Sequence, residues 1–416
     1  MTIKSSIHAG RQASRGPSRP TQLLALSAVM ALPAFLAACG GGGEATPERR
    51  AQRAETAEKV VVGVVWPWQA RSELLFSEGI DMAVEEVSAS GGIDGRPLEI
   101  RREDDNESVN EGRLMAQTLV NDPDVMAVIG HLQSHVTVPA AAIYELGGVL
   151  LFAPAATSPE LTSKGYRHIF RGTFDDAFTG SKLAEYALAR GWKKIAIYYV
   201  RSIYGRTLSN AFEERLSRDL EAQVVARDSY DPVQRVRAEK LEQEIVRWRQ
   251  LELDAIFLAS EVPAAGDIIR TIRTAGIDVP ILGGDAMSSP ALIQTGGEAV
   301  EGTVVACFFH PEDPRPVVRE FVEQFRAEHG KVPDVGAALA YDAVKVLVHA
   351  MRQAGTPAPG AVAEALRTMA PFEGVTGTFA FDDSGTLEGR RPCLVEVRDG
   401  DFHYSSASAG GSGGES

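Results

Sequence analysis

Short apolar runs alternate with longer amphipathic stretches along most of this 416-residue chain. Runs of four to eight apolar residues predict buried strands, and apolar residues spaced three or four apart predict helices. In a first series, strands are predicted at residues 60–66, 99–102, 125–129 and 149–152, with helices at 72–88, 109–119 and 138–146. Because strands that alternate with helices form parallel sheets through right-handed crossovers, this series predicts an α/β lobe.

A second series of the same kind predicts a second α/β lobe. Its strands are predicted at residues 194–200, 223–226, 255–258 and 281–283, with helices at 207–220, 237–251 and 264–275. Further helices are predicted at 317–329, 335–353 and 360–369, and a last strand at 390–397. The length also favours more than one domain, so we expect two doubly wound, Rossmann-like lobes.

The N-terminal residues have the pattern of an export signal. Four basic residues and no acidic ones precede a mostly apolar run at 21–38, which predicts a signal peptide over residues 1–38. The sequence L-A-A-C at 36–39 is similar to a bacterial lipobox, which implies cleavage before Cys39 and acylation of its sulfur. The alternatives are an ordinary signal peptide with an incidental cysteine, or a transmembrane helix, for which the run is barely long enough.

Low-complexity segments flank the predicted lobes. Residues 39–57 begin with Cys39 and four glycines, and we expect them to form a flexible tether. Residues 405–416 are rich in Ser and Gly, and we expect a disordered tail there.

The charge balance argues against polyanionic partners. The net charge is -14, and loss of the signal peptide with its four positive charges makes it -18. An acidic surface does not favour nucleic acid as a partner. Cys307 and Cys393 remain beside Cys39, and in an oxidising compartment they form either a disulfide or two buried free thiols.

Small and hydroxyl residues follow two predicted strands of the first lobe. They are Gly130 and Ser134 after residues 125–129, and Ala155, Ala156 and Thr157 after residues 149–152. Ligands of open α/β sheets bind beyond the carboxyl ends of strands, and hydroxyls beside backbone N–H groups suit a carboxylate. The sequence therefore predicts an anion pocket in a protein that binds a small molecule without transforming it.

Sequence motifs for catalysis or metal binding are weak. The G-x-S-x-G match at 410–414 lies in the predicted tail, away from any strand–turn–helix elbow. His131 and His135 lack an evident third ligand, so we do not expect zinc. We find no P-loop and no G-x-G-x-x-G pattern. We therefore expect no catalytic residue, no metal and no cofactor.

A series of short motifs between about Val60 and Phe402 carries a family resemblance. They are G-G-I-D-G at 91–95, D-D at 104–105, I-G-H-L-Q-S at 129–134, A-P-A-A-T-S-P at 153–159, F-R at 170–171, Y-G at 204–205, E-G at 301–302 and A-Y-D-A at 340–343. In this order they resemble the type I periplasmic substrate-binding proteins of ABC importers, specifically the branched-chain (Leu/Ile/Val) amino-acid-binding family. The motifs are less specific for the ligand, because relatives bind other amino acids, amides or organic acids.

The resemblance implies two lobes joined by a three-crossover hinge, which close on a ligand in the cleft between them. Lobe 1 would comprise residues 58–174 and 309–382, and lobe 2 residues 175–308 and 383–404. Together with the lipobox-like sequence, it implies a monomeric periplasmic or cell-surface lipoprotein, held on the bacterial membrane, that delivers an amino acid or a close analogue to an ABC permease. The alternative is a ligand-sensing receptor subunit with the same fold.

The resemblance also implies roles for individual residues. Ser134 and Thr157 fall where hydroxyls bind the amino-acid head, Ala155 where a backbone group does so, and Asp285 where an acid pairs with the ammonium. Tyr204 matches a cleft-lining aromatic, and Leu132 and Ala156 belong to the same motifs. A buried zwitterion needs a hydrogen-bonding or oppositely charged partner for each of its charges, and this set of residues provides such partners. The structural alternatives are helix caps for Ser134 and Asp285, a turn for Thr157, and surface packing for Tyr204.

Two departures from the family pattern bear on the ligand. Glu261 stands where amino-acid binders of the family often carry an aromatic residue, so it either selects a second positive or donor group or is solvated. The segment 65–71 lacks the Gly and Ser common in the family's first loop. Trp66 or Trp68 either walls the pocket or lies in the lobe core, and we favour Trp66 in the cleft. Simple leucine binding is therefore less well supported than binding of an amino-acid-like molecule.

Overall fold

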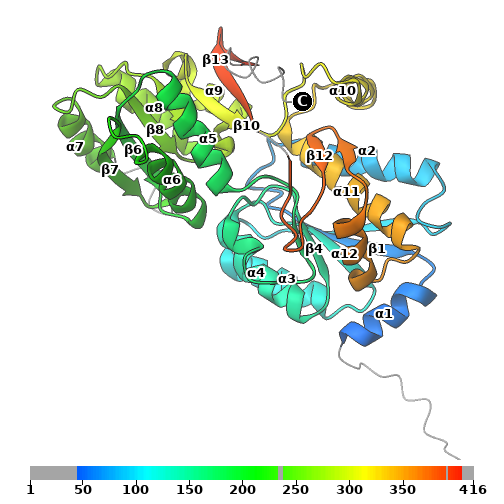
Figure 1. The fold of residues 1–416 in the computed structure, drawn as a ribbon. Helices are drawn as coiled ribbons and strands as arrows, with labels where there is room; N and C mark the ends of the chain where they lie inside the picture. Colours follow the sequence, from blue (N-terminus) through cyan, green and yellow to red (C-terminus); the bar gives the residue numbers. More distant parts are fainter. Residues whose placement is uncertain (1–44, 233–237, 390–391, 405–416) are drawn as a thin grey trace, which may run out of the picture. The chain divides into compact units, whose positions relative to one another are not determined.

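The computed structural model describes residues 45–232, 238–389 and 392–404 (Figure 1). The predicted signal peptide, Cys39, the glycine run and the Ser/Gly tail lie outside the described residues. Within the described ranges, no helix is both long and apolar enough to cross a bilayer.

Lobe 1 is built on a parallel five-stranded sheet with the order β2-β1-β3-β4-β5. The strands are β1 (Val60–Val65), β2 (Leu98–Glu103), β3 (Val125–Gly130), β4 (Leu150–Ala153) and β5 (Ile169–Arg171). Its helices are α2 (Phe76–Ala89), α3 (Val109–Val120), α4 (Ser134–Leu146), α10 (Pro316–His329), α11 (Val335–Ala354) and α12 (Pro359–Thr368). A short ribbon of β11 (Phe372–Gly374) and β12 (Gly377–Phe379) follows α12.

Strand β1 is buried on both faces because alternate side chains enter different cores. Val62 and Val64 pack in the cluster that contains residues of α2, α11 and α12. Val61 and Val65 pack in the cluster that contains residues of α3 and α4. This arrangement explains the continuous apolar run, which is typical of parallel strands covered on both sides.

Helices α2 and α11 approach closely at Gly79. A Cβ atom built on Gly79 would lie 2.2 Å from the carbonyl oxygen of Ala337 on α11. No larger residue fits there unless the two helices separate, so Gly79 holds α2 against the lobe core.

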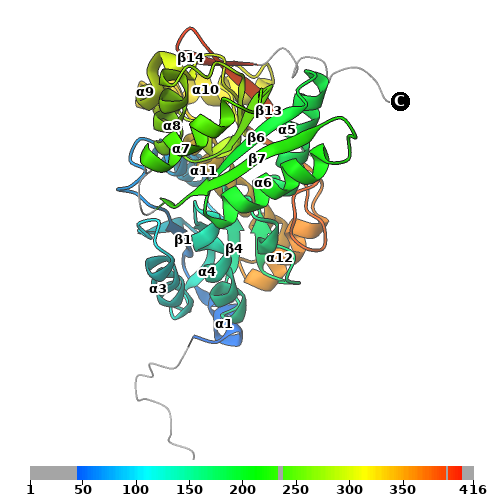
Figure 2. The same cartoon turned by 90° about the vertical axis from the view of Figure 1, so that its left-hand side faces the viewer.

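Lobe 2 is built on a seven-stranded sheet with the order β14-β13-β10-β9-β8-β6-β7. Its parallel strands are β6 (Lys194–Val200), β7 (Gln223–Tyr230), β8 (Ala255–Ala259), β9 (Ile281–Gly283) and β10 (Val304–Cys307). Strands β13 (Cys393–Arg398) and β14 (Asp401–Tyr404) are antiparallel to their neighbours. The helices are α5 (Asp176–Ala189), α6 (Ile203–Leu216), α7 (Ala238–Trp248), α8 (Ala264–Thr274) and α9 (Pro290–Gly296), several of which surround the sheet in Figure 2.

The chain passes between the lobes three times, from β5 to α5, from β10 to α10, and from β12 to β13. Two parallel-sheet lobes joined by three crossovers are the predicted fold class, which is confirmed. A disulfide joins Cys307 of β10 to Cys393 of β13, which face each other in the antiparallel pair.

Two helix boundaries differ from the predictions, and both differences affect the site described below. Helix α2 begins at Phe76 rather than at residue 72, which leaves residues 67–75 as a loop. Helix α4 begins at Ser134, four residues earlier than predicted, and contains Pro139 in its interior.

The predicted flexible tether over residues 39–57 is wrong for residues 47–56, which form helix α1 (Pro47–Thr56). The Thr46 side chain caps this helix, and Pro47 occupies its first turn. Arg50 is completely buried. Its guanidinium donates to the carbonyl oxygens of Val120 and Asp122 at 2.6 Å each, and also to that of Val125. Carbonyls at a helix end need donors, and Arg50 supplies them at the end of α3.

Replacing Arg50 by Ala should therefore lower the free energy of unfolding by about 2–4 kcal/mol, because buried carbonyls lose their donors and a buried volume is emptied. Thermal unfolding of the form that lacks residues 1–39 measures this change. The matched control is Arg113→Ala, since Arg113 is exposed on α3. Equal melting temperatures for the two variants would contradict the anchoring role of Arg50.

Candidate functional site

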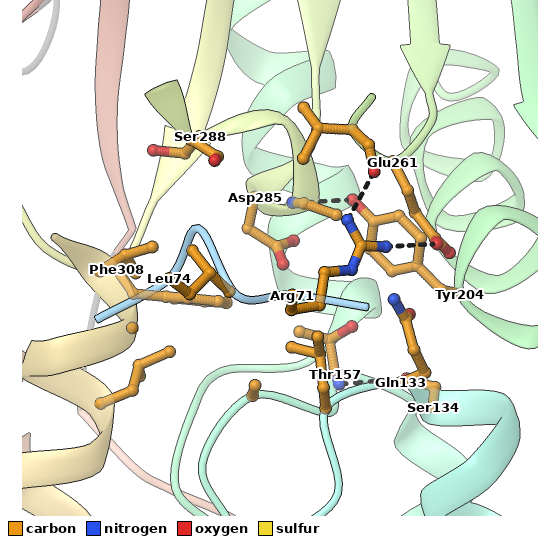
Figure 3. A pocket seen from close by; sticks show the side chains of 18 of the residues that line it. Arg71, Leu74, Gln133, Ser134, Thr157, Tyr204, Glu261, Asp285, Ser288 and Phe308 are labelled. Carbon is orange, nitrogen blue, oxygen red and sulfur yellow. Dashed lines mark hydrogen bonds and ion pairs between the residues drawn. The ribbon is translucent and has the colours of Figure 1, made fainter. Parts of the chain in front are cut away.

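A pocket lies between the strand ends of the two lobes (Figure 3). All of the predicted ligand-binding residues except Ala156 line it, namely Trp66, Leu132, Ser134, Ala155, Thr157, Tyr204, Glu261 and Asp285. Ala156 is 1% exposed and belongs to the hydrophobic cluster behind the pocket, so including it in the site was wrong. Its neighbours Ala155 and Thr157 point to the pocket side of the loop after β4.

Ser134 is the first residue of α4, and Gln133 occupies the capping position. The Ser134 Oγ accepts hydrogen bonds from the backbone N–H groups of Thr157 and Ser158, both at 3.2 Å. The hydroxyl therefore ties α4 to the loop after β4 rather than capping its own helix. Since both contacts use Oγ as an acceptor, its O–H remains to donate to an acceptor in the pocket.

Asp285 lies across the pocket from Ser134 and Thr157, just beyond β9 of lobe 2 (Figure 3). Its Oδ1 is buried and has no hydrogen-bond partner among the described residues. Burial and, less strongly, the nearby charge of Glu261 raise the pKa of Asp285 to about 7, although hydrogen bonds from the backbone and from Tyr204 oppose this shift. A buried carboxylate with an unsatisfied oxygen is unfavourable, and a bound ammonium would donate a hydrogen bond to it.

Tyr204 is the second residue of α6 and is 4% exposed, so the surface-packing alternative is wrong. Its hydroxyl oxygen accepts a hydrogen bond from the backbone N–H of Ala286 at 3.3 Å. This contact fixes the turn that carries Asp285, so the aromatic residue both lines the pocket and positions its neighbouring acid.

A second acid near Asp285 was missed by the sequence analysis. Asp176 is the first residue of α5 and is completely buried. Its Oδ2 accepts from the Thr207 hydroxyl, while its Oδ1 has no partner among the described residues. Burial raises the pKa of Asp176 well above its usual range, and the charge of Asp285 adds to this rise. Asp176 does not itself line the pocket, and it lies buried behind the wall close to Asp285.

Apolar side chains line another part of the pocket. Leu74 and Phe308 lie on the side away from Glu261 and Tyr204 in Figure 3. Trp66 is 1% exposed and stacks on Phe76 with ring centroids 3.6 Å apart, so it belongs to the lobe core as well as to the pocket wall. Aliphatic residues of α11 complete this side, which suits a hydrocarbon group on the ligand.

Arg71 was also missed, because its partners Glu261 and Val262 are distant in the sequence. The structure places its guanidinium in the pocket, where its Nη2 lies 3.9 Å from Oε2 of Glu261. The Glu261 side chain is only 16% exposed, so the solvated alternative is wrong. Burial raises the pKa of Glu261, and the charge of Arg71 opposes this rise. Glu261 therefore faces a cation of the protein itself.

His131 and His135 do not come together as a metal site. His131 is buried with its Nδ1 2.6 Å from Oδ2 of Asp105 and its Nε2 3.2 Å from the Tyr144 hydroxyl. His135 lies 3.2 Å from the backbone carbonyl oxygen of Glu107. Among the described residues, no group of three or more His, Cys, Asp or Glu side chains is arranged to hold a metal ion.

Comparison with known proteins agrees with this fold. The family described as periplasmic binding protein matches residues 59–400. The chain belongs to this family. The match to a Leu/Ile/Val-binding protein homolog of Brucella abortus is 31% identical over 356 residues and spans 83% of this chain and 93% of the relative. The predicted Leu/Ile/Val-binding branch is thus confirmed.

Solved structures of the periplasmic binding protein family extend the comparison. An ABC transporter substrate-binding protein from Desulfitobacterium hafniense, in complex with Leu, is 34% identical to this chain, and the two structures superpose with a TM-score of 0.75. The similarity covers 83% of this chain and 100% of the Desulfitobacterium protein. A solute-binding protein from R. palustris, in complex with benzoate, is 18% identical to this chain, with a TM-score of 0.72. The similarity covers 83% of this chain and 95% of the R. palustris protein. At that identity the second likeness shows the fold alone. The chain is thus a substrate-binding protein by family.

Proposed function

We propose that this periplasmic binding protein captures an α-amino acid, or a close analogue, in the pocket between its lobes and delivers it to an ABC importer. One observation carries the proposal. Ser134 and Thr157 of lobe 1 line a single pocket with Asp285 of lobe 2, whose buried Oδ1 has no hydrogen-bond partner among the described residues. A zwitterion has the complementary pair of charges, and charge-assisted hydrogen bonds are the strong ones.

The apolar side of the pocket supports an aliphatic side chain on that amino acid. Leu74 and Phe308 line it together with Trp66. The Desulfitobacterium relative in complex with Leu is consistent with this assignment. We take L-leucine as the first probe.

A thermal shift assay tests the proposed function. The form that lacks residues 1–39 is unfolded and refolded to strip any carried ligand, and is then screened against amino acids, amides and organic acids that include benzoate. A ligand at about 1,000 times its dissociation constant stabilises the folded state by roughly 4 kcal/mol, which raises the melting temperature by several degrees. We expect the largest shifts from neutral α-amino acids.

Matched variants assign the response to this pocket. The shift should vanish in Asp285→Ala and in Ser134→Ala, and should persist in Asp267→Ala and Ser163→Ala, whose side chains are exposed elsewhere. A response only to organic acids without an ammonium group would show that the pocket does not bind amino acids.

We also propose that the mature protein is a monomeric lipoprotein on the outer side of a bacterial membrane. The L-A-A-C sequence before Gly40 supports this proposal. In cells, the wild-type chain should incorporate a labelled fatty acid, and Cys39→Ala should abolish this incorporation, because the acylation site is lost. Equal incorporation of the label by Cys39→Ala would rule out a lipid anchor at this residue.

A further inference from the structure

Arg71 lies in the loop between β1 and α2, with its side chain 9% exposed. The loop is held by its own backbone. The Arg71 N–H donates to the carbonyl oxygen of Pro67 at 2.9 Å, and the Leu74 N–H donates to that of Arg71 at 3.1 Å. The buried guanidinium therefore projects from a defined turn at the rim of lobe 1.

The guanidinium contacts groups of both lobes. Within lobe 1, its Nε lies 2.5 Å from Oε1 of Glu107, and its Nη1 lies 3.9 Å from Oε1 of Glu73. Toward lobe 2, its Nη1 donates to the carbonyl oxygen of Val262 at 2.6 Å, and its Nη2 lies 3.9 Å from Oε2 of Glu261. Figure 3 shows this bridge between the first loop of lobe 1 and the segment that follows β8.

The lobe 1 end of this bridge leads to the start of α4. The Gln133 Nε2 donates to the same Oε1 of Glu107, at 3.2 Å. Gln133 is the capping residue of α4 and directly precedes Ser134, whose hydroxyl we assign to the ligand carboxylate. One guanidinium thus connects the rim of lobe 2 to the helix start that carries the carboxylate site.

We propose that Arg71 is a positioning residue that latches lobe 2 to lobe 1 across the pocket, and so favours the closed arrangement in which both halves of the site meet. The planar guanidinium has five donors in a fixed fork, which allows it to bond Glu107 and Val262 at once. A lysine ammonium keeps the charge but not the fork. A contact shifts the equilibrium between open and closed lobes only if it forms in one of the two states. The bonds from Arg71 to lobe 2 form only when the lobes are closed.

The latch is tested first on lobe distance, which requires no ligand. Spin labels are placed at Leu114→Cys in lobe 1 and Leu220→Cys in lobe 2, both exposed positions, and the native cysteines stay paired. Pulsed electron paramagnetic resonance on the refolded form lacking residues 1–39 should show a population with the short distance between the two spin labels that the closed lobes give. Arg71→Met should deplete this population, and Arg71→Lys should restore it only in part. The matched control is Arg319→Met, at an exposed site on α10.

The effect on affinity rests on the proposed function, and it is measured separately. Arg71→Met should weaken binding of the strongest amino acid by about tenfold or more, because closure then lacks the latch contacts. Glu261→Gln removes the charge of a lobe 2 partner of Arg71, and it serves as the second variant if Arg71→Met fails to fold. It should also weaken amino-acid binding, but by a smaller factor than Arg71→Met.

The outcomes separate the two ideas. An unchanged distance distribution in both Arg71→Met and Glu261→Gln overturns the latch, whatever binds. Weaker binding with unchanged distances also overturns it, and would make Arg71 a residue that contacts the ligand. Depleted short distances in a protein that binds no amino acid would uphold the latch and refute the proposed function.

Discussion

Asp285→Asn is expected to weaken binding of an amino acid by about 100-fold while leaving the unbound protein at least as stable as the wild type. The loss of affinity follows from the removal of a buried, charge-assisted partner of the ammonium, for which losses of about 2–5 kcal/mol are typical. The stability is retained because the carboxylate is buried without a partner at Oδ1, so an amide avoids the burial of a charge. Calorimetric titration and thermal unfolding of the same samples measure the two effects.

The pH dependence of both quantities follows from the raised pKa of Asp285, which is about 7. Binding requires the ionised carboxylate, so affinity should fall by up to about tenfold per unit as the pH drops below 7, and level off above it. In the unfolded chain an Asp has a pKa of about 3.9, so between pH 4 and 7 the folded state binds more protons than the unfolded state. The contribution of this group to stability therefore decreases as the pH rises through that window.

Asp285→Asn removes both of these dependences. Its advantage in melting temperature over the wild type should grow from pH 4 to pH 7 and then remain constant. The matched control is Asp267→Asn, because Asp267 is exposed on α8. A variant that melts well below the wild type at pH 8 would indicate that Asp285 has a structural role instead.

Replacing both cysteines of the disulfide is expected to lower the free energy of unfolding by about 4.6 kcal/mol, according to the chain-entropy estimate for a loop of this length. Cys307 and Cys393 are separated by 86 residues, which include α10, α11 and α12 of lobe 1. The bond thus closes a covalent ring that leaves lobe 2, passes through lobe 1 and returns. Without it, the unfolded chain regains the freedom of that whole segment.

The double variant Cys307→Ser/Cys393→Ser should still fold, because β10 and β13 remain paired through their backbones. Its melting temperature should be lower by several degrees. A reductant should lower the melting temperature of the wild type toward that of the variant and leave the variant unchanged. A wild-type protein that melts at the same temperature with and without reductant would contradict the stabilising role of the bond.

The sequence predicted the strands correctly where burial on both faces of the sheet produces an unbroken apolar run. Strands β1, β3 and β8 were predicted to within about a residue, since each is buried along its whole length. The motif order added the lobe arrangement and most of the pocket. Ser134, Thr157, Tyr204 and Asp285, which come from different elements, meet in one pocket as the resemblance implied.

Features that depend on distant contacts were not readable. Helix α1 has no apolar stripe, because a buried arginine rather than a hydrophobic face anchors it. Helix α5 was not predicted at all, and Asp176 was lost with it. The role of Arg71 depends on Glu261 and Val262, which lie some 190 residues further along the chain, and no local pattern indicates that contact.

The central claim is that one pocket recognises both charges of an α-amino acid. Calorimetric titration with L-leucine, or with the strongest amino acid of the screen, and with two analogues tests it most directly. The first analogue, 4-methylpentanoate, lacks the ammonium, and the second, isopentylamine, lacks the carboxylate. Since each charge contributes a buried charge-assisted bond, we predict that each analogue binds at least about 100-fold more weakly than the amino acid. Equal binding of 4-methylpentanoate and L-leucine would contradict the account, because Asp285 would then have no part in recognition.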